Sequence, residues 1–141
     1  MSGFLLDTNC ISEVVRPSPS PSVVAWFDAA DESLLYLSVL TLGEIRKGIA
    51  SLPQSRRRTS LESWLDADLR QRFEGRVLSV DASVADRWGL LAAEAKRRGR
   101  TLAVIDGLLA ATALAHNLTV VSRNAADFAA THVPVLNPWD A

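Results

Sequence analysis

The sequence predicts an α/β fold with a central, mostly parallel sheet that is covered by helices on both sides. Short continuous apolar runs, typical of buried strands, alternate with longer segments whose apolar residues recur at helical spacing. The apolar runs lead into Asp, Ser or Thr, which favour turns and helix caps. Strands that alternate with helices in this way are typical of a parallel sheet.

The first predicted strand is Phe4–Leu6, which runs directly into Asp7. After it, Thr8 or Asn9 can cap a short helix that reaches Val15. Ligands bind at the carboxyl edge of open parallel sheets, so Asp7 has the position of a functional carboxylate.

A linker rich in serine and proline, residues 18–22, separates this helix from the next, for which Ser22 is the predicted cap. Residues 34–39 are predicted to form the second buried strand. Thr41 and Glu44 then have the spacing of a capping box, which predicts the start of the following helix.

The chain continues with a charged amphipathic helix over 55–73 and a short strand at 77–80. Asp81 is the predicted cap of a helix that ends at Gly99. Both helices carry apolar residues at core spacing, so we expect them to cover the sheet.

The last third begins with a helix of unusually small residues, which Asp106 is predicted to open and which reaches Ala115. Residues 118–122 are predicted to form a fourth strand. The tail 133–139 contains Pro134, which suits an edge strand better than a central one.

Length and composition predict one compact domain spanning residues 1–141. Hydrophobic residues make up 48% of the chain, enough for a well-filled core. The one cysteine excludes an internal disulfide and fits a reducing cytoplasm. The first residues do not resemble a signal peptide, and the apolar stretches fall far short of the roughly 18 residues that a membrane span needs, so no membrane contact is expected.

The net charge of −1 does not by itself indicate a nucleic-acid-binding protein. Two local basic runs could contact nucleic acid, at residues 56–58 and 96–100, although such runs are also typical of a solvated helix face or loop.

Four acids fall at comparable points of different strand–helix units: Asp7, Glu44, Asp106 and Asp127. In a doubly wound sheet these points face the same edge, where close carboxylates repel one another unless a cation compensates. An all-oxygen ligand set favours Mg²⁺ or Mn²⁺ over zinc. Spacing alone leaves another interpretation open, in which these acids are helix caps, a capping-box acid and a turn residue.

Four segments follow one another along the chain: Leu5-Leu6-Asp7-Thr8-Asn9 with Ile11-Ser12-Glu13, Ser38 through Ile45, Asp106 through Ala113, and Ser122 through Phe128, and the chain ends with Asn137-Pro138-Trp139 close to its last residue. In this order they resemble the motifs of PIN-domain proteins, in particular the VapC-type toxins with their FitB-like branch, whose ending the tail resembles. The resemblance covers essentially the whole chain.

The resemblance implies a three-layer α/β/α sandwich and a Mg²⁺- or Mn²⁺-dependent ribonuclease in which metal-activated water attacks an RNA phosphodiester. Asp7 and Asp106 match the acids that the family uses most directly as metal ligands, and Glu44 and Asp127 match the third and fourth. The polar residues that match the lining of the same site are Thr8, Ser122 and Asn124.

The resemblance also implies a homodimer and a cognate antitoxin whose tail fills the acidic cleft, commonly with an arginine. A different class of function is a PIN-fold regulatory module that acts through a complex with a DNA-binding antitoxin and has little nuclease activity. A phosphatase of the haloacid-dehalogenase type is disfavoured, because Asn9 stands where that chemistry needs a second aspartate.

Overall fold

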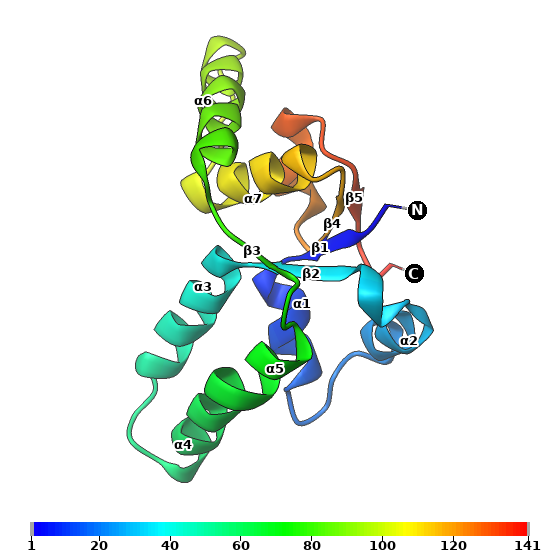
Figure 1. The fold of residues 1–141 in the computed structure, drawn as a ribbon, viewed down its shortest axis with the longest axis vertical. Coiled ribbons are helices and arrows are strands. Elements are labelled where there is room, and N and C mark those ends of the chain that lie inside the picture. The colour runs from blue at the N-terminus through cyan, green and yellow to red at the C-terminus, as the bar shows by residue number, and fades with distance from the viewer. Residues whose placement is uncertain (1, 141) are drawn as a thin grey trace.

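A parallel sheet forms the centre of the computed structural model, which describes residues 2–140 (Figure 1). Within these residues the strand order is β3-β2-β1-β4-β5, and every pairing is parallel. The strands are β1 (Phe4–Leu6), β2 (Leu35–Ser38), β3 (Val77–Leu78), β4 (Thr119–Val121) and β5 (Val135–Leu136). The predicted parallel sheet is confirmed, and β5 lies at its edge as Pro134 suggested.

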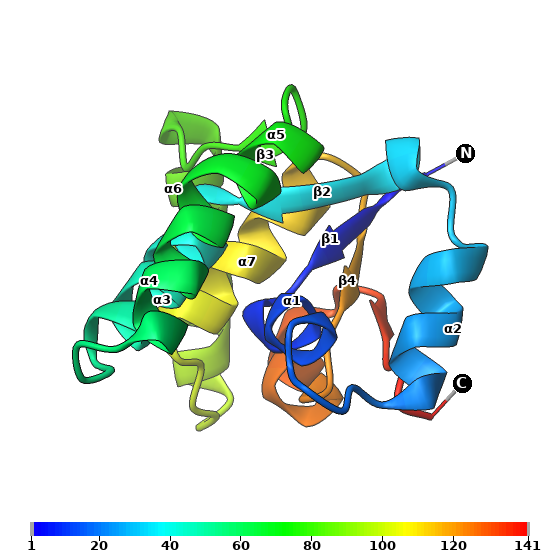
Figure 2. The same cartoon turned by 90° about the horizontal axis from the view of Figure 1, so that it is seen from below.

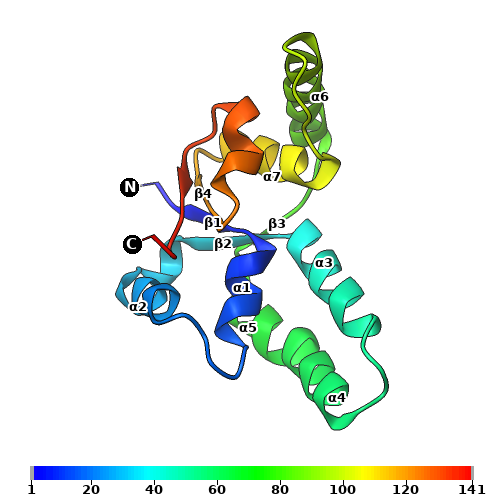
Figure 3. The same cartoon turned by 180° about the vertical axis from the view of Figure 1, so that it is seen from behind.

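Helices cover both faces of the sheet, which confirms the three-layer α/β/α sandwich (Figures 1 and 3). One layer contains α1 (Thr8–Val14), α2 (Pro21–Ala29), α3 (Val39–Ala50), α4 (Arg56–Ser63), the π-helical segment η2 (Trp64–Leu69) and α5 (Arg70–Arg72). The other contains α6 (Ala82–Arg97), α7 (Val104–Ala115) and the 3₁₀ helix η3 (Ala125–Thr131), while a short 3₁₀ helix η1 (Glu32–Leu34) precedes β2. None of the helices within residues 2–140 combines the length and the apolar character that a membrane crossing requires.

The central strand β1 is buried on both faces, and its residues alternate between two cores. Leu5 packs with Val120 in the core beneath α6 and α7, whereas Leu6 packs with Val121 in the core beneath α1 and α3. Figure 2 shows α1 directly following the carboxyl end of β1. Burial on both sides explains why this strand is a continuous apolar run rather than an alternating one.

Two of the predicted helix starts were wrong, and both affect the acidic edge. The cap of α1 is Asp7, whose Oδ1 accepts the Thr8 N–H at 2.8 Å, rather than Thr8 or Asn9, so the alternative interpretation of Asp7 as a helix cap is confirmed. The cap of α3 is Ser38, whose Oγ accepts the Leu40 N–H at 3.0 Å. Thr41 is therefore buried inside the helix, and the capping box with Glu44 does not form.

Two other helices begin earlier than expected. α2 starts at Pro21, because proline is preorganised for the first helical position and needs no N–H partner there. α7 starts at Val104, so Asp106 lies in its first turn instead of opening it. A carboxylate in the first turn interacts favourably with the helix dipole, so this position is stable without a cap.

Other signals held. Asp81 caps α6 by accepting the Val84 N–H at 2.9 Å, and Gly99 follows that helix with a positive φ of 66°. The amphipathic helix predicted over 55–73 spans α4, η2 and α5, and its six-residue π-helical part was not predicted. π-helical turns widen the helix locally, and no residue type in the sequence marks one.

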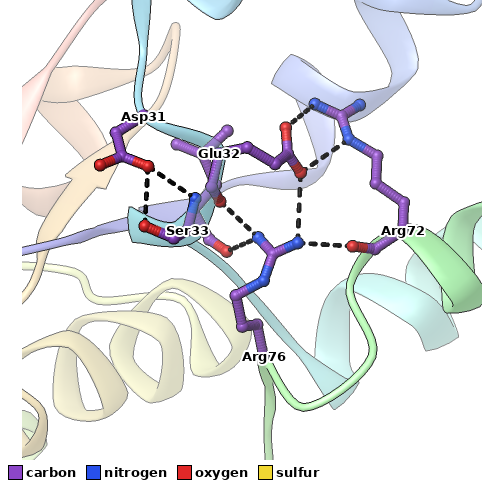
Figure 4. Close-up of polar contacts among 6 residues, drawn as sticks. Asp31, Glu32, Ser33, Arg72 and Arg76 are labelled. Carbon is purple, nitrogen blue, oxygen red and sulfur yellow. Dashed lines mark hydrogen bonds and ion pairs between the residues drawn. The ribbon is translucent and has the colours of Figure 1, made fainter.

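A cluster of charged side chains joins the beginning of β2 to the chain that enters β3 (Figure 4). The Arg76 Nη1 donates to the carbonyl oxygens of Glu32 and Leu35, both at 2.6 Å. Arg72 donates to the two oxygens of the Glu32 carboxylate at 2.9 and 3.0 Å, and this hydrogen bonding lowers the pKa of Glu32. The cluster lies at the amino end of the strands and thus supports the sheet from the side opposite to Asp7.

Gly107 permits close packing of α6 against α7, and we expect Gly107→Ala to destabilise the protein. A Cβ at this position would lie 2.9 Å from Cδ1 and 3.0 Å from Nε1 of Trp88. Overpacking of a core costs about 1–3 kcal/mol, which outweighs the gain of about 1 kcal/mol in helix propensity. Urea denaturation should therefore show a lower free energy of unfolding.

Gly89→Ala in α6 is the matched control, because a Cβ there meets no atom within 4 Å. This variant should be more stable than the wild type by about 0.5–1 kcal/mol. Equal gains from the two substitutions would show that α6 and α7 separate easily at Trp88.

Candidate active site

The carboxyl edge of the sheet gathers the acids that the sequence singled out. Asp7 follows β1 directly, Glu44 lies in α3, Asp106 lies in the first turn of α7, and Asp127 belongs to η3. Figure 1 shows that α1 and α3 begin at the ends of β1 and β2, with α7 on the opposite face of the sheet. The parallel sheet thus brings residues from four separate segments to one edge.

Asp7 is the most buried of these acids, with 8% of its surface exposed. Its Oδ2 accepts a hydrogen bond from the Ser122 hydroxyl at 2.8 Å, and its backbone N–H donates to the Val121 carbonyl at 2.9 Å. Burial raises the pKa of Asp7, and the charges of Glu44 and Asp127 add to this rise, against the lowering effect of its hydrogen bonds. The carboxylate is therefore held in one orientation at a site that disfavours its charge.

Ser122 and Asn9 form the polar support beneath Asp7. The Ser122 Oγ also accepts the backbone N–H of Asn124 at 3.0 Å and an Asn9 side-chain N–H at 3.3 Å. The Asn9 Oδ1 accepts the backbone N–H of Arg123 at 3.3 Å. These hydrogen bonds connect the start of α1 to the end of β4, and they orient the Asp7 carboxylate.

Thr8 holds the second acid. Its hydroxyl donates to Glu44 Oε1 at 2.6 Å, so a residue that the sequence paired with Thr41 is bonded instead to the start of α1. Thr8 and Glu44 also line a groove of about 260 Å³ between α1, α3 and α4. Much of this groove is apolar, and Leu61 and Trp64 also line it.

Asp106 and Asp127 face a second pocket, which we call the acid pocket. It has a volume of about 330 Å³, and its wall includes Arg100, Thr101 and Ala103 from the segment before α7. Burial, together with the charges of Asp7, Asp127 and Glu44, raises the pKa of Asp106 to about 6. Asp7, Asp127 and Glu44 therefore all act electrostatically on Asp106.

No ion pair within residues 2–140 neutralises these acids, since the ion pairs found there involve none of the four carboxylates. In the same part of the chain, no three acidic, histidine or cysteine side chains lie close enough together to form a ready-made metal cage. Mg²⁺ keeps several waters and commonly uses only one or two carboxylates, so this all-oxygen, unneutralised set fits a hydrated divalent cation.

The structure brings together most of the residues that the sequence proposed, in different roles. Thr8 and Ser122 hydrogen-bond to acids, whereas Asn124 contributes its backbone N–H to Ser122. Sequence reasoning did not predict a role for Asn9 in the site; it treated Asn9 as a possible helix cap, as part of the first motif and as evidence against a phosphatase. Its position two residues after Asp7 was visible, but its second partner, Ser122, lies 113 residues away in sequence.

The raised pKa of Asp106 predicts that the metal-free protein is stabilised by Asp106→Asn at neutral pH. Between about pH 4 and 6 the folded state retains a proton that the unfolded state loses, so the free energy of unfolding falls as pH rises through this window. The asparagine side chain does not titrate, so the Asp106→Asn variant does not lose stability in this way as pH rises. In EDTA, chemical denaturation should show no advantage of the variant near pH 4 and a constant advantage above about pH 6.

Glu32→Gln provides a control of opposite sign. The folded-state pKa of Glu32 is lowered by Arg72, so its contribution to stability is present at neutral pH and is lost as pH falls through the acid range. This variant should be less stable than the wild type at pH 7. A pH-independent difference for Asp106→Asn would contradict the raised pKa of Asp106.

The comparisons with known proteins agree with this architecture. The PIN domain family model matches residues 4–133. The chain is 38% identical over 137 residues to VapC ribonuclease Y4jK of Sinorhizobium fredii, covering 97% of this chain and 98% of that protein. It is 42% identical over 136 residues to toxin FitB of Neisseria gonorrhoeae, covering 96% and 98%. The crystal structure of FitAcB from Neisseria gonorrhoeae superposes with a TM-score of 0.94 at 40% identity, covering 98% of this chain and 99% of that one.

Proposed function

This chain belongs to the PIN-domain family, in its VapC- and FitB-like branch, and from that premise we propose that it is a metal-dependent ribonuclease, the toxin of a type II toxin–antitoxin pair. One observation carries the proposal beyond family membership. Asp7, Glu44, Asp106 and Asp127 converge at the carboxyl edge of the sheet, where they repel one another and have no basic partner within the described chain. A protein that keeps such an arrangement keeps it at a cost in stability, which indicates a functional use.

We assign Asp7 and Asp106 as the principal ligands of a Mg²⁺ or Mn²⁺ ion, with Glu44 and Asp127 completing the acidic site. When bound, the ion supplies positive charge against the phosphodiester and an activated water. In the hydrolysis, a water oxygen forms a new bond to phosphorus while the bond from phosphorus to the leaving oxygen breaks. That oxygen takes up a proton, so one product ends in a phosphate group and the other in a hydroxyl group.

The protein's own groups hold the acids for this reaction. Ser122 and Asn9 fix the orientation of Asp7, and the Thr8 hydroxyl fixes Glu44. Groups that are oriented before the substrate arrives need not reorganise during the reaction, which is the main source of electrostatic catalysis. Asp106 and Asp127 face the acid pocket, where the substrate phosphate can approach them.

The test is RNA cleavage by the purified, antitoxin-free protein in Mg²⁺ or Mn²⁺, with an EDTA control. We expect cleavage that EDTA abolishes and that added metal restores. The melting temperature of the protein should rise when metal is added, because a ligand that binds only the folded state stabilises it. Metal binding without cleavage of either structured or unstructured RNA would favour a regulatory module that acts through a DNA-binding antitoxin. No metal binding would contradict the assigned ligand set.

A cognate antitoxin is the protein partner that we propose, by resemblance to the VapC-type toxins. An arginine from its tail would find unneutralised carboxylates at the site, and such pairs are strong when they are bidentate. The toxin and antitoxin would meet in the cytoplasm, where the RNA substrate is also present. Co-expression with the product of an adjacent small reading frame should yield a complex in which metal-dependent cleavage is lost.

We also propose that the protein is a homodimer. Among residues 2–140, three large apolar side chains are exposed in the isolated chain, namely Val39 at 41%, Leu90 at 68% and Val104 at 58%. They lie at the first residues of α3 and α7 and within α6. Sedimentation analysis should give a dimer for the wild type and a monomer for Leu90→Glu combined with Val104→Glu. A monomeric wild type would contradict this assembly.

A further inference from the structure

The acid pocket contains one guanidinium that the proposed metal site does not use. Arg100 lines the acid pocket together with Asp106 and Asp127. Its side chain is exposed, and it belongs to none of the ion pairs or side-chain hydrogen bonds found within residues 2–140. A cation that borders two carboxylates without pairing with either remains available for a third group.

The basic run that contains Arg100 is not a uniform solvated face. Arg98, two residues earlier, forms an ion pair with Glu94, with 2.7 Å between Nη2 and Oε1. Its Nη1 lies 3.2 Å from Nε2 of His132. Arg97 projects from the last turn of α6 and does not line the acid pocket. Position within the run, rather than its total charge, therefore distinguishes Arg100.

The backbone at Arg100 is held firmly by the end of α6. Gly99 adopts a positive φ of 66°, the Gly99 N–H donates to the Lys96 carbonyl at 3.0 Å, and the Arg100 N–H donates to the Ala95 carbonyl at 2.8 Å. This pair of hydrogen bonds is a Schellman motif, which fixes the chain immediately after a helix. The base of the Arg100 side chain is therefore presented to the pocket from a rigid position.

An RNA phosphodiester needs positive charge on its route to this site. Each phosphate is negative, and the four acids repel it even when a divalent ion neutralises part of their charge. A guanidinium binds phosphate through two parallel hydrogen bonds, which supplies both charge and orientation. We propose that Arg100 binds a phosphate of the RNA backbone in the acid pocket and positions the strand for cleavage. This inference rests on the ribonuclease function proposed above.

The test compares Arg100→Ala, Arg100→Lys and the matched control Arg97→Ala. Arg100→Ala should lower kcat/KM for RNA cleavage by about 10- to 100-fold, the range expected for one charged hydrogen-bonding group. Arg100→Lys should recover part of this loss, because it restores charge but not the bidentate geometry. Arg97→Ala removes the same charge from the same helix end and should change kcat/KM by less than about twofold.

The affinity for a single-stranded RNA oligonucleotide, measured at several salt concentrations, separates phosphate contact from a structural role. In an Asp7→Asn background that prevents cleavage, Arg100→Ala should reduce the slope of log affinity against log salt by about 0.7, the value for one phosphate contact on a single strand. Arg100→Lys should keep the slope. Thermal melts should be unchanged, because the Arg100 side chain makes no hydrogen bond within the described chain.

Two outcomes would overturn the inference: cleavage and salt slope unchanged in Arg100→Ala, or equal losses in Arg97→Ala. The first means that Arg100 does not contact phosphate, and the second means that only the overall charge of the run matters. If the wild type cleaves no RNA, the proposed function fails separately. The binding assay on the wild-type background then still decides whether Arg100 contacts the strand.

Discussion

Replacement of both Asp7 and Asp106 by asparagine is expected to lower metal-dependent RNA cleavage by a factor of about 10³ or more. Asp7 directly follows β1 and Asp106 lies in the first turn of α7; burial and the charge of Asp7 together raise the pKa of Asp106. Asparagine keeps the size of each side chain but removes the negative charge that holds a divalent ion. The measurement is the initial rate of cleavage at saturating Mg²⁺ or Mn²⁺ for both single variants and the double variant.

The single variants should each lose about 10²–10³-fold, and the double variant should lose less than the product of the two, since ligands of one ion act as a unit. Asp86→Asn on the exposed face of α6 is the control and should cleave at the wild-type rate. Thermal melts confirm that each variant is folded, and asparagine at position 7 remains a good helix cap. Undiminished, EDTA-sensitive cleavage by the double variant would place the catalytic centre elsewhere.

The second large effect concerns stability, where Phe73→Ala is expected to lower the free energy of unfolding by about 3–5 kcal/mol. The Phe73 ring is fully buried in the core beneath α1 and α3. The Cζ atoms of Arg72 and Arg76 lie 5.1 and 5.0 Å from its centroid, so the ring also supports the charged cluster at the start of β2. Each such cation–π contact adds about 0.5–1 kcal/mol.

Urea denaturation is the measurement, with two comparison variants. Phe73→Leu retains most of the buried volume and should lose about 1–1.5 kcal/mol, so it remains folded even if the alanine variant does not. Phe27→Ala removes a half-buried ring whose centroid lies 5.6 Å from Cζ of Arg72. It should lower the free energy of unfolding clearly less than Phe73→Ala does. Equal costs at the two positions would mean that Phe73 is not a central part of this core.

Local sequence patterns were sufficient for the architecture of this protein. The apolar run Phe4–Leu6 predicted a strand buried on both faces, and the structure shows Leu5 and Leu6 in opposite cores. Asp81 and Gly99 predicted both ends of α6. These signals work because a strand buried twice must be apolar throughout, and because caps and positive φ angles depend on a few adjacent residues.

Local patterns failed where two signals competed for the same helix end. Thr41 and Glu44 have the spacing of a capping box, yet Ser38 caps α3 and Thr41 is buried within it. The sheet decides this, because β2 ends at Ser38 through its pairing with β3 and the helix begins at once. Spacing along the chain cannot show where a strand stops pairing.

The sequence by itself determined the strand–helix order, the parallel sheet and the acids at its carboxyl edge. Only the tertiary structure decided the partners of those acids: the Thr8 hydroxyl bonds Glu44 across 36 residues, and Ser122 bonds Asp7 across 115. It also decided which arginine of the basic run borders the acid pocket. Local conformation depends on neighbouring residues, whereas the partner of a side chain depends on which strands lie next to each other, and that follows from burying the two cores together.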